Sequence, residues 1–553
     1  MRDQLLSRVV EAVERLAQRR DADPSALLGG VSLTPSKSPE HGDFATNAAL
    51  VLAKPLRAAP RELADELVSE LGDCGGSLAR AEVAGPGFVN LFLTAGRWRD
   101  VLSRVLREGE AYGRSEGGKG REVMVEFVSA NPTGPLTIGH GRNAVLGDCL
   151  AGLLQATGHS VTREYYFNDA GRQMRVLAAS LRARYAQLLG RDEPLPEDGY
   201  RGEYLVEVAR ALVDEHGDGW LEADESAFQR RAQEAIFAGI EATLDRLGIR
   251  FDVYSNERVL YDTGRVDRCL ADLRDAGLVY EKDGAVWLES TRFGLNRDRV
   301  LVKSSGEATY LLPDIAYHRE KLERVRTTID VLGPDHVEQF PYVRAAAEAL
   351  GLDPQAIELV LYQWVNLRRG GEKVKMSTRE ASFVTVDEIL DDVGVDAFRY
   401  FMIERRADTH LDFDVDLARE RSDRNPVYKI QYAHARLCSI ERRAAEQGFE
   451  VAGAASIPFE LLTAPREEEL IRLLERFPDL IRHAAKAREP QEVARYLLDL
   501  SSAFHAYVSD GKRHRVIGED RELSAARLGL VGALRATLAN GLRLLGIQAP
   551  ERM

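Results

Sequence analysis

Cysteine is scarce in this chain of 553 residues, which contains only four. They lie far apart, at Cys74, Cys149, Cys269 and Cys438. No two have the close spacing of a zinc site, and their scatter excludes a disulfide framework. We therefore expect no structural metal and a reducing compartment, most simply the cytoplasm.

Long uncharged apolar runs are also missing. The N-terminal segment has apolar positions from Leu5 to Leu16, but Arg and Glu residues stand between them. This is the pattern of an amphipathic helix, and no run in the chain is long and apolar enough to cross a bilayer. We therefore expect no membrane partner.

An excess of positive charge is missing too, because the net charge is −14. That balance argues against a protein that coats nucleic acid through bulk electrostatics. Basic residues do gather in 368–379 and 419–436, but such clusters are more often solvated faces than binding sites. The composition, 44% hydrophobic and 29% charged, is typical of a globular protein, and the length predicts three or four domains.

Among the features that are present, residues 122–168 stand first. An apolar, β-favouring run from Val123 to Val128 precedes a loop rich in Pro and Gly, a helix with an apolar face, and a second β-favouring run from Val161 to Phe167. This βαβ order is typical of a parallel sheet with a ligand site beyond the strand ends. The loop ends in Gly-His-Gly (139–141), where glycines and free N–H groups at a helix N-terminus favour phosphate. A tight turn with a surface histidine is the alternative.

The chain divides into four parts. Residues 1–110 have the pattern of an α+β module, with a strand expected at 88–93, and the module ends in a polar, glycine-rich linker. Residues 111–365 alternate strand and helix patterns and contain a helical insertion, with long helical stretches expected at 172–189 and 203–247. Residues 366–425 are mixed, and residues 426–553 have helical periodicity throughout. The prediction is an α/β fold in which a parallel-sheet domain accompanies an α+β module and an all-α bundle.

Three further sets of side chains could carry chemistry. Residues 370–379 place two glycines before several Lys, Ser, Thr and Arg residues, which makes a basic, phosphate-binding loop or an ordinary charged one. Tyr310 and Asp314 are four residues apart, so a helix would bring them to one face. If Asp314 is buried, it needs solvent or a cation as a partner. Glu257 follows a strand-like run and alone would be interpreted as a surface residue.

Together these motifs resemble the class I aminoacyl-tRNA synthetases. Residues 138–142 (IGHGR) and, over two hundred residues later, 375–379 (KMSTR) are similar to the two signature motifs of that class. The segments that narrow the resemblance to arginyl-tRNA synthetases are SANPTGP (129–135), TYLLPDIAYH (309–318), LGPDH (332–336), EHGDFATN (40–47) and the C-terminal NGLRLLGIQAPERM. The resemblance covers the chain from about residue 30 to its C-terminus.

Two positions depart from the pattern of that family. Thr137 stands where the first motif usually has its first histidine, and a hydroxyl can donate a hydrogen bond but supplies no positive charge. The second motif continues with Thr378 and Arg379 where a lysine is usual. Arg379, Lys373 and Lys375 remain alternatives for the second cation.

The resemblance implies a Rossmann-type catalytic domain, an N-terminal tRNA-binding module and a C-terminal anticodon-binding bundle, with residues 366–425 carrying a mobile loop and stem contacts. It implies that arginine is activated with ATP, as MgATP, and transferred to the terminal adenosine of tRNA(Arg), with release of AMP and pyrophosphate. We expect a monomer.

Matched residue by residue, the resemblance also implies the site. The catalytic residues would be His140, Lys375 and Arg379. ATP would be bound by Pro135, Thr137, Gly139, His140, Gly141, Lys375, Met376 and Ser377. Arginine would be bound by Ser129, Asn131, Glu257, Tyr310 and Asp314, with Asp335 a weaker expectation. The tRNA would be bound by Phe44, Asn47, Tyr428, Tyr432, Arg436 and Met553, with Asp43 and Tyr507 as further candidates. A structural turn for the N-terminal residues and core packing for some of the tyrosines remain the alternatives.

Two rival interpretations share part of the pattern. A nucleotidyltransferase of the same sheet type would have the Gly-His loop, but it would have no use for the two flanking domains. A synthetase-like protein that binds tRNA without charging it would be compatible with Thr137. The presence of Glu257, Tyr310, Asp314 and Lys375 argues against that second rival.

Overall fold

The computed structural model describes residues 2–23, 28–36, 38–169, 171–374, 384–449, 456–511 and 513–553. The chain forms two compact units. The first contains Met1–Tyr112, Arg436–Phe477 and Ser502–Thr537, and the second contains Gly113–Ala435, Pro478–Ser501 and Leu538–Met553. No helix in the described ranges combines the length and the apolar composition that crossing a membrane requires.

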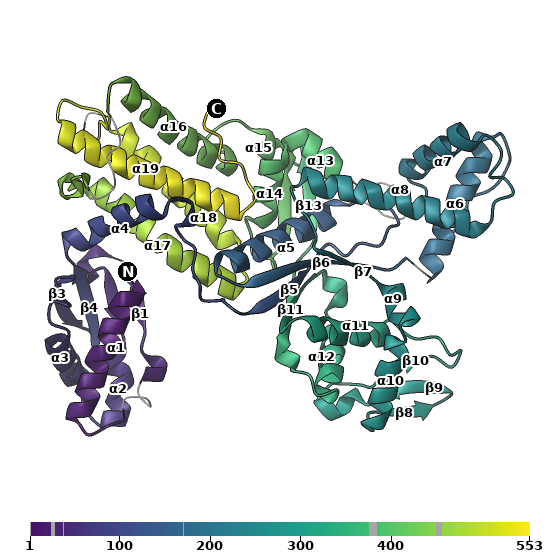
Figure 1. Cartoon of the computed structure of the whole chain (residues 1–553), viewed down its shortest axis with the longest axis horizontal. Helices are drawn as coiled ribbons and strands as arrows, with labels where there is room; N and C mark the ends of the chain where they lie inside the picture. The colour runs from purple at the N-terminus through teal and green to yellow at the C-terminus, as the bar shows by residue number, and fades with distance from the viewer. Residues whose placement is uncertain are drawn as a thin grey trace. The chain divides into compact units, whose positions relative to one another are not determined.

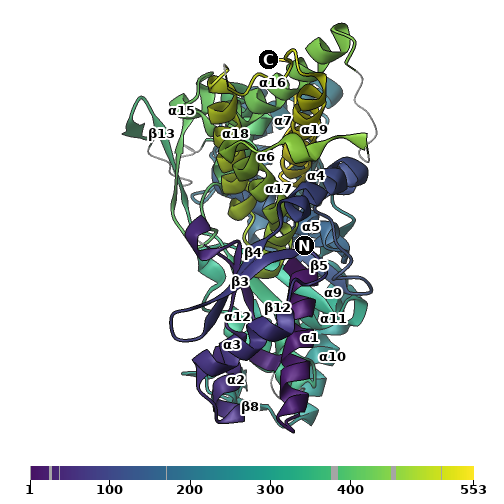
Figure 2. The same ribbon diagram turned by 90° about the vertical axis from the view of Figure 1, so that its left-hand side faces the viewer.

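The N-terminal part of the first unit folds as the predicted α+β module. Its elements are α1 (Arg2–Arg19), β1 (Leu33–Pro35), β2 (Phe44–Thr46), α2 (Ala48–Leu56), α3 (Pro60–Leu71), β3 (Leu78–Ala84), β4 (Phe88–Leu93) and α4 (Ala95–Glu108). The antiparallel sheet has the order β1-β2-β4-β3, and α1 and α3 lie side by side next to it (Figure 2). Leu5, Val9 and Leu16 of α1 are buried in the core of this module, as the spacing of an amphipathic helix predicts.

Four long helices make up the C-terminal part of the chain, as its periodicity predicts. They are α16 (Pro426–Glu446), α17 (Pro465–Ala487), α18 (Gln491–Ser509) and α19 (Arg521–Leu544). Their periodic apolar residues are buried, among them Ile430, Leu474, Leu497 and Leu538. The predicted all-α bundle is confirmed.

A five-stranded parallel sheet forms the centre of the second unit (Figure 1). Its strands are β5 (Glu122–Glu126), β6 (Ser160–Phe167), β7 (Val253–Asn256), β11 (Thr327–Leu332) and β12 (Ile357–Leu361). Their order is β12-β11-β5-β6-β7, and every neighbouring pair is parallel. The direction of winding reverses between β5 and β11, and such a switch point leaves a crevice at the carboxyl ends of the strands. The predicted Rossmann-type sheet is confirmed.

Helix α5 (Ile138–Ala156) connects β5 to β6 and is buried over most of its surface, with 14 of its 19 residues buried. The predicted apolar face is therefore only part of its contact surface. A Cβ atom on Gly147 would lie 2.2 Å from Cγ of Phe127, so a glycine is required where the helix meets the end of β5. This close packing fixes the N-terminus of α5 next to the strand ends.

The other elements of the second unit are connections and additions to this sheet. Between β6 and β7 lies the predicted helical insertion, which consists of α6 (Gly171–Leu188), α7 (Glu203–His216) and α8 (Glu225–Arg246) (Figure 1). The stretch expected as helical at 203–247 forms the last two of these helices. Between β7 and β12 lie α9 (Glu257–Asp262), α10 (Arg265–Asp275), β8 (Val279–Lys282), β9 (Ala285–Leu288), β10 (Arg299–Val302), α11 (Leu311–Arg324) and α12 (Phe340–Ala349). After β12 come β13 (Val365–Arg369), β14 (Glu372–Lys373), α13 (Val386–Val393), α14 (Val395–Ile403), β15 (Leu411–Asp414) and α15 (Val415–Arg419).

Candidate active site

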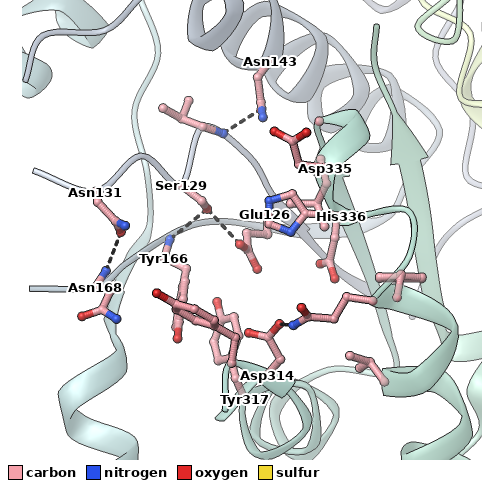
Figure 3. Close-up of a pocket in the computed structure, with 18 of the residues that line it drawn as sticks. Glu126, Ser129, Asn131, Asn143, Tyr166, Asn168, Asp314, Tyr317, Asp335 and His336 are labelled. Atoms are coloured by element: carbon pink, nitrogen blue, oxygen red, sulfur yellow. Dashed lines mark hydrogen bonds between the residues drawn. The ribbon is translucent and has the colours of Figure 1, made fainter. Parts of the chain in front are cut away.

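A cavity of about 530 Å³ opens at the switch point of the parallel sheet (Figure 3). Residues at or beyond the ends of β5, β6, β7 and β11 line it, together with the first turns of α5 and α11. Its size and position are typical of a small-molecule site in a doubly wound fold. The predicted residues that line it are Ser129, Asn131, His140, Glu257, Tyr310, Asp314 and Asp335.

A sharp bend in the backbone after β5 directs Ser129 into this cavity. Val128 and Ser129 have φ angles of 65° and 43°, a left-handed conformation that a β-branched residue such as Val128 adopts rarely. Asn143 of α5 holds the bend, because its Oδ1 accepts from the Val128 N–H at 2.7 Å. The Nδ2 of Asn143 also donates to the Val331 carbonyl at 2.9 Å. One amide therefore joins the ends of β5 and β11 at the switch point.

Ser129 and Asn131 are held by hydrogen bonds to their neighbours (Figure 3). The Ser129 hydroxyl donates to Glu126 Oε1 at 2.8 Å and accepts from the Tyr166 N–H at 3.2 Å. Asn131 Oδ1 accepts from the Asn168 N–H at 2.9 Å. The hydroxyl hydrogen of Ser129 is therefore already donated, so the hydroxyl can only accept a hydrogen bond from a ligand.

Glu257 follows β7 at the start of α9 and is half-buried. Tyr166 donates its hydroxyl hydrogen to Glu257 Oε2 at 2.9 Å. Burial raises the pKa of the Glu257 carboxyl, although the hydrogen bond from Tyr166 opposes the shift. Glu257 thus lines the cavity and is not the exposed surface residue that its local sequence suggests.

Asp314 lies in the first turn of α11, and Tyr310 precedes this helix with 77% of its surface exposed. Asp314 Oδ2 accepts a hydrogen bond from the side-chain amide of Gln339. Asp314 is partly exposed to solvent and has a neutral amide partner, so a cation as its further partner stays a prediction. Burial raises the pKa of Asp314 to about 7, and the nearby charges of Glu126 and Glu257 add to the shift.

Thr137 and His140 are in direct contact at the start of α5. The Thr137 N–H donates to Nδ1 of His140 at 3.2 Å, and the Thr137 hydroxyl lies 3.3 Å from the same nitrogen. Because Nδ1 accepts, the proton of a neutral ring is on Nε2. Burial lowers the pKa of His140, which favours this neutral form. His140 therefore offers a hydrogen-bond donor and not a positive charge.

The two glycines beside His140 have different roles. A Cβ atom on Gly139 would meet nothing closer than the Thr137 hydroxyl at 3.9 Å, so this position is open to a ligand. A Cβ atom on Gly141 would lie 2.5 Å from Cζ of Phe398. The Gly141 N–H also donates to the Thr137 carbonyl at 3.0 Å. Gly141 thus serves helix packing, which corrects the expectation that it leaves a free N–H group for phosphate.

Sequence models of three domain families match the chain. The "Arginyl tRNA synthetase N terminal domain" matches residues 3–93, the "tRNA synthetases class I (R), catalytic domain" matches residues 101–416, and the "DALR anticodon binding domain" matches residues 430–553.

The chain belongs to the arginyl-tRNA synthetase family. The arginine–tRNA ligase of Desulfotalea psychrophila is 50% identical over 552 residues, which cover 99% of this chain and 100% of that protein. The arginine–tRNA ligase of Salinibacter ruber is 48% identical, over 95% of this chain and 96% of that protein. The solved structure of Thermus thermophilus arginyl-tRNA synthetase has a TM-score of 0.77 at 25% identity and covers all of both chains.

Several residues with expected roles in this family lie away from the cavity or beyond the described ranges. Lys375, Met376, Ser377 and Arg379 fall in 375–383, outside the described residues. Pro135 is half-buried in the loop before α5, and neither it, Thr137, Gly139 nor Gly141 lines the cavity.

The N-terminal residues expected to contact tRNA have structural roles in their own module. Phe44 is 2% exposed and belongs to the hydrophobic core. Asn47 accepts from the Ser32 N–H at 2.7 Å and donates to the Gly30 carbonyl at 3.0 Å. Asp43 accepts from the Leu93 N–H at 2.7 Å. These placements favour the alternative of a structural turn and disagree with an RNA contact through the Phe44 ring.

The C-terminal candidates divide into exposed and buried residues. On α16, the rings of Tyr428 and Tyr432 stack with their centroids 6.1 Å apart and 5° between their planes. Tyr432 is 39% exposed and Met553 is 55% exposed, while Arg436 is half-buried. Tyr507 is fully buried and donates to Glu467 at 3.3 Å, so it is a core residue.

Sequence reasoning missed Gln339, Tyr166 and Asn143. Gln339 follows the LGPDH motif by three residues, and Asn143 comes directly after the first signature motif. Proximity to these motifs was the available signal. No such signal marked Tyr166 apart from its place in a predicted strand, because its contact with Glu257 joins residues 91 positions apart.

Proposed function

We propose that this chain is an arginine–tRNA ligase, which forms arginyl-adenylate from arginine and ATP and transfers the arginyl group to the 3′-terminal adenosine of tRNA(Arg). The observation that supports this most strongly is the meeting of Glu257 and Asp314 in one cavity with Ser129 and Asn131. Two carboxylates in one cavity suit a planar cation, and the residues after β5 suit the amino-acid end of the substrate.

Glu257 and Asp314 are the proposed partners of the arginine guanidinium. Burial raises the pKa of both carboxyls, so each gains stability when a bound cation replaces the lost water. Gln339 orients Asp314, Tyr166 orients Glu257, and the exposed Tyr310 covers the side chain. A guanidinium can use both carboxylates through its several N–H groups, whereas the ammonium of lysine is a point charge.

Ser129 is the proposed partner of the α-ammonium group. Its own proton is donated to Glu126 and its oxygen already accepts from Tyr166, so the remaining lone pair can only accept. An ammonium group donates, whereas a carboxylate does not. The two ends of the amino acid therefore have distinct partners, with the guanidinium near α11 and the α-ammonium near β5.

ATP is proposed to bind along the N-terminus of α5. Gly139 allows close approach, Nε2 of the neutral His140 donates to a phosphate or ribose oxygen, and Pro135 and Thr137 shape the loop. By family resemblance, Lys375, Met376, Ser377 and Arg379 complete the site and stabilise charge on the pyrophosphate. Mg²⁺ is proposed to arrive with the ATP phosphates, and the described residues contain no cluster of three or more His, Cys, Asp or Glu side chains suited to a metal ion.

The 3′ end of the tRNA is proposed to enter through a neighbouring cavity of about 1140 Å³. This cavity shares Asn131, Asn168, Glu257 and Tyr310 with the first one. Its other lining residues include the cations Arg172, Arg175 and Lys303. Residues on the shared wall would bring the two substrates of the transfer step together.

The other assignments of the family complete the proposal. Residues 426–553 bind the anticodon stem-loop, with the Tyr428–Tyr432 pair, Arg436 and Met553 as contacts, because stacked aromatic rings favour unpaired bases. Residues 1–110 contact the tRNA, residues 111–365 catalyse the reaction and residues 366–425 carry the mobile loop and stem contacts. The protein is proposed to act as a monomer in the cytoplasm.

Aminoacylation of unfractionated tRNA with each amino acid in turn tests the function. Charging with arginine alone is the expected result, and charging with any other amino acid would refute the proposal. ATP–pyrophosphate exchange with and without tRNA separates activation from transfer. A nucleotidyltransferase would not charge tRNA, and its pyrophosphate exchange would not depend on tRNA. A non-catalytic tRNA-binding protein would show no charging at all.

A further inference from the structure

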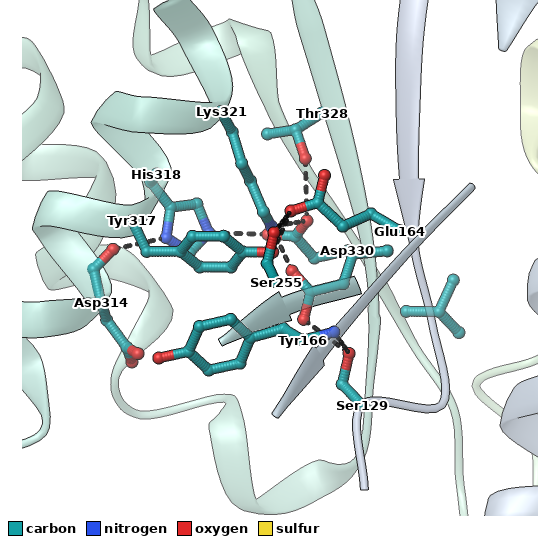
Figure 4. A network of polar contacts seen from close by, with 12 residues as sticks. Ser129, Glu164, Tyr166, Ser255, Asp314, Tyr317, His318, Lys321, Thr328 and Asp330 are labelled. Carbon is teal, nitrogen blue, oxygen red and sulfur yellow. Dashed lines mark hydrogen bonds and ion pairs between the residues drawn. The ribbon is translucent and has the colours of Figure 1, made fainter. Parts of the chain in front are cut away.

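A buried cluster of charged side chains forms part of the wall of the cavity and extends away from it to Lys321 (Figure 4). Its members are Glu126 of β5, Asp330 of β11, and His318 and Lys321 of α11. All four are less than one-tenth exposed, and Lys321 is fully buried. We refer to these four residues as the ionic cluster.

Lys321 lies between the two carboxylates of the ionic cluster. Its Nζ is 2.7 Å from Asp330 Oδ1 and also pairs with Glu126 Oε2. The ring of Tyr317 covers the ammonium group, with its centroid 4.4 Å away. Burial alone would lower the pKa of Lys321, but the attraction of Asp330 and Glu126 outweighs burial and raises it. The ammonium group therefore stays charged inside the protein.

His318 is the second basic side chain of the ionic cluster. Its Nε2 lies 2.7 Å from Asp330 Oδ2, and its Nδ1 lies 2.7 Å from the backbone oxygen of Asp314. Both ring nitrogens thus lie at hydrogen-bond distance from an oxygen atom. The ionic cluster therefore contains two basic and two acidic side chains.

The ionic cluster contacts both ends of the proposed arginine site. Glu126 accepts from the Ser129 hydroxyl at 2.8 Å, and His318 holds the carbonyl of Asp314. Tyr310, Asp314, His318 and Lys321 follow one another at intervals of three or four residues, so they share one face of α11. Along this row the exposed fraction falls from 77% at Tyr310 to 0% at Lys321.

The ionic cluster also divides the buried and half-buried carboxylates of the cavity into two groups, while the fifth lining carboxylate, Asp335, is exposed. Glu126 and Asp330 are neutralised by Lys321 and His318. Glu257 and Asp314 have neutral partners, Tyr166 and Gln339, and form no ion pair with a basic side chain in the part of the chain that the structure describes. A cationic substrate therefore meets Glu257 and Asp314 as half-buried carboxylates with no basic partner among the described residues.

Resting on the proposed function, we propose that Lys321 and His318 are positioning residues of the arginine site. They neutralise Glu126 and Asp330, hold Ser129 and the first turn of α11, and leave Glu257 and Asp314 to pair with the guanidinium. Because these contacts hold arginine equally in the ground state and the transition state, their loss should raise KM for arginine and leave kcat nearly unchanged.

The test compares Lys321→Met with Arg399→Met in the full-length protein. Arg399 is also fully buried and pairs with Asp148 at 2.5 Å, but it does not line the cavity. Both variants should unfold at lower urea concentration. Only Lys321→Met should raise KM for arginine, about tenfold, with kcat and KM for ATP within threefold of wild type. An unchanged KM for arginine in folded Lys321→Met would overturn the proposal.

A double variant tests whether charge balance is the cause. Lys321→Met with Glu126→Gln removes one charge of each sign and keeps an acceptor for Ser129, so KM for arginine should return to within threefold of wild type. A KM that stays raised in this double variant refutes the role in charge balance. If Lys321→Met does not fold, His318→Gln serves instead, with a rise of threefold or more expected and no change overturning the proposal. Failure of the wild-type protein to charge arginine would refute the proposed function, which is a different result.

Discussion

Replacing Asp314 by asparagine removes one charge from the proposed arginine site and almost no volume. Hydrogen bonds to charged groups contribute about 1.5–3 kcal/mol and neutral ones about 0.5–1.5 kcal/mol. For two N–H groups of a guanidinium on this carboxylate, the loss is about 2 kcal/mol, or roughly a 30-fold rise in KM for arginine. We expect kcat to change much less, because the contact is made before and during the reaction.

The substitution should not damage the fold, which separates binding from stability. The pKa of Asp314 is raised to about 7 in the folded protein, above the value of an unfolded chain. A raised pKa means that the group stabilises the fold in its protonated form, most fully below about pH 4, and that this stability is lost as the pH rises through about 7. The asparagine side chain of the variant does not ionise, so at pH 8 the variant should be at least as stable to urea as wild type.

The same pKa predicts how arginine binding depends on pH. Wild-type KM for arginine should rise as the pH falls below about 7, because Asp314 must lose its proton to pair with the cation. In Asp314→Asn the dependence should be flatter. The assay is ATP–pyrophosphate exchange with tRNA present, from pH 6 to 8, with Glu338→Gln as the control, since Glu338 is an exposed carboxylate one residue from Gln339. A KM for Asp314→Asn within threefold of wild type at pH 8 would refute the assignment.

Three other substitutions test separate parts of the site. Gly141→Ala should lower the free energy of unfolding by about 1–3 kcal/mol in urea titrations, because its Cβ would lie 2.5 Å from Phe398. Gly139→Ala should leave the free energy of unfolding unchanged and raise KM for ATP. Equal effects of the two substitutions would contradict the separate roles of the two glycines. Tyr432→Ala should raise KM for tRNA about tenfold in aminoacylation assays, since base–aromatic stacking contributes about 1–3 kcal/mol, whereas an unchanged KM would remove it from the tRNA surface. Lys375→Ala should lower kcat for adenylate formation more than it raises KM for arginine, and a normal kcat would exclude a transition-state role.

Much of the fold follows from local patterns in the sequence. The strand Phe88–Leu93 has the predicted bounds, and the helix expected at 172–189 is found at Gly171–Leu188. The βαβ unit at 122–168 was also predicted correctly. These predictions succeed because hydrophobic periodicity and the signals of turns and helix ends depend on residues close together in the chain. The helical stretch expected at 203–247 is also found, as two helices with a break between them.

Site residues that lie in sequence motifs were predictable, whereas residues placed by contacts between distant parts of the chain were not. Family resemblance assigned Glu257 and Asp314 to arginine, and the structure brings both into one cavity. It did not assign Gln339, whose amide reaches Asp314 only because α12 folds back beside α11. Arg142, inside the most recognisable motif, is fully buried and donates to three backbone carbonyls, of Gln363, Arg406 and Thr409.

The sequence by itself determined the order of the elements, the parallel sheet, the helical C-terminal part and the residue types of an arginine site. Only the tertiary structure decided which charged residues are buried and what neutralises them. Lys321 resembles a surface lysine in its local sequence, yet it is fully buried between Glu126, 195 residues before it, and Asp330. The physical reason is that the cost of burying a charge depends on partners that folding brings together, and those partners leave no signal in the local sequence.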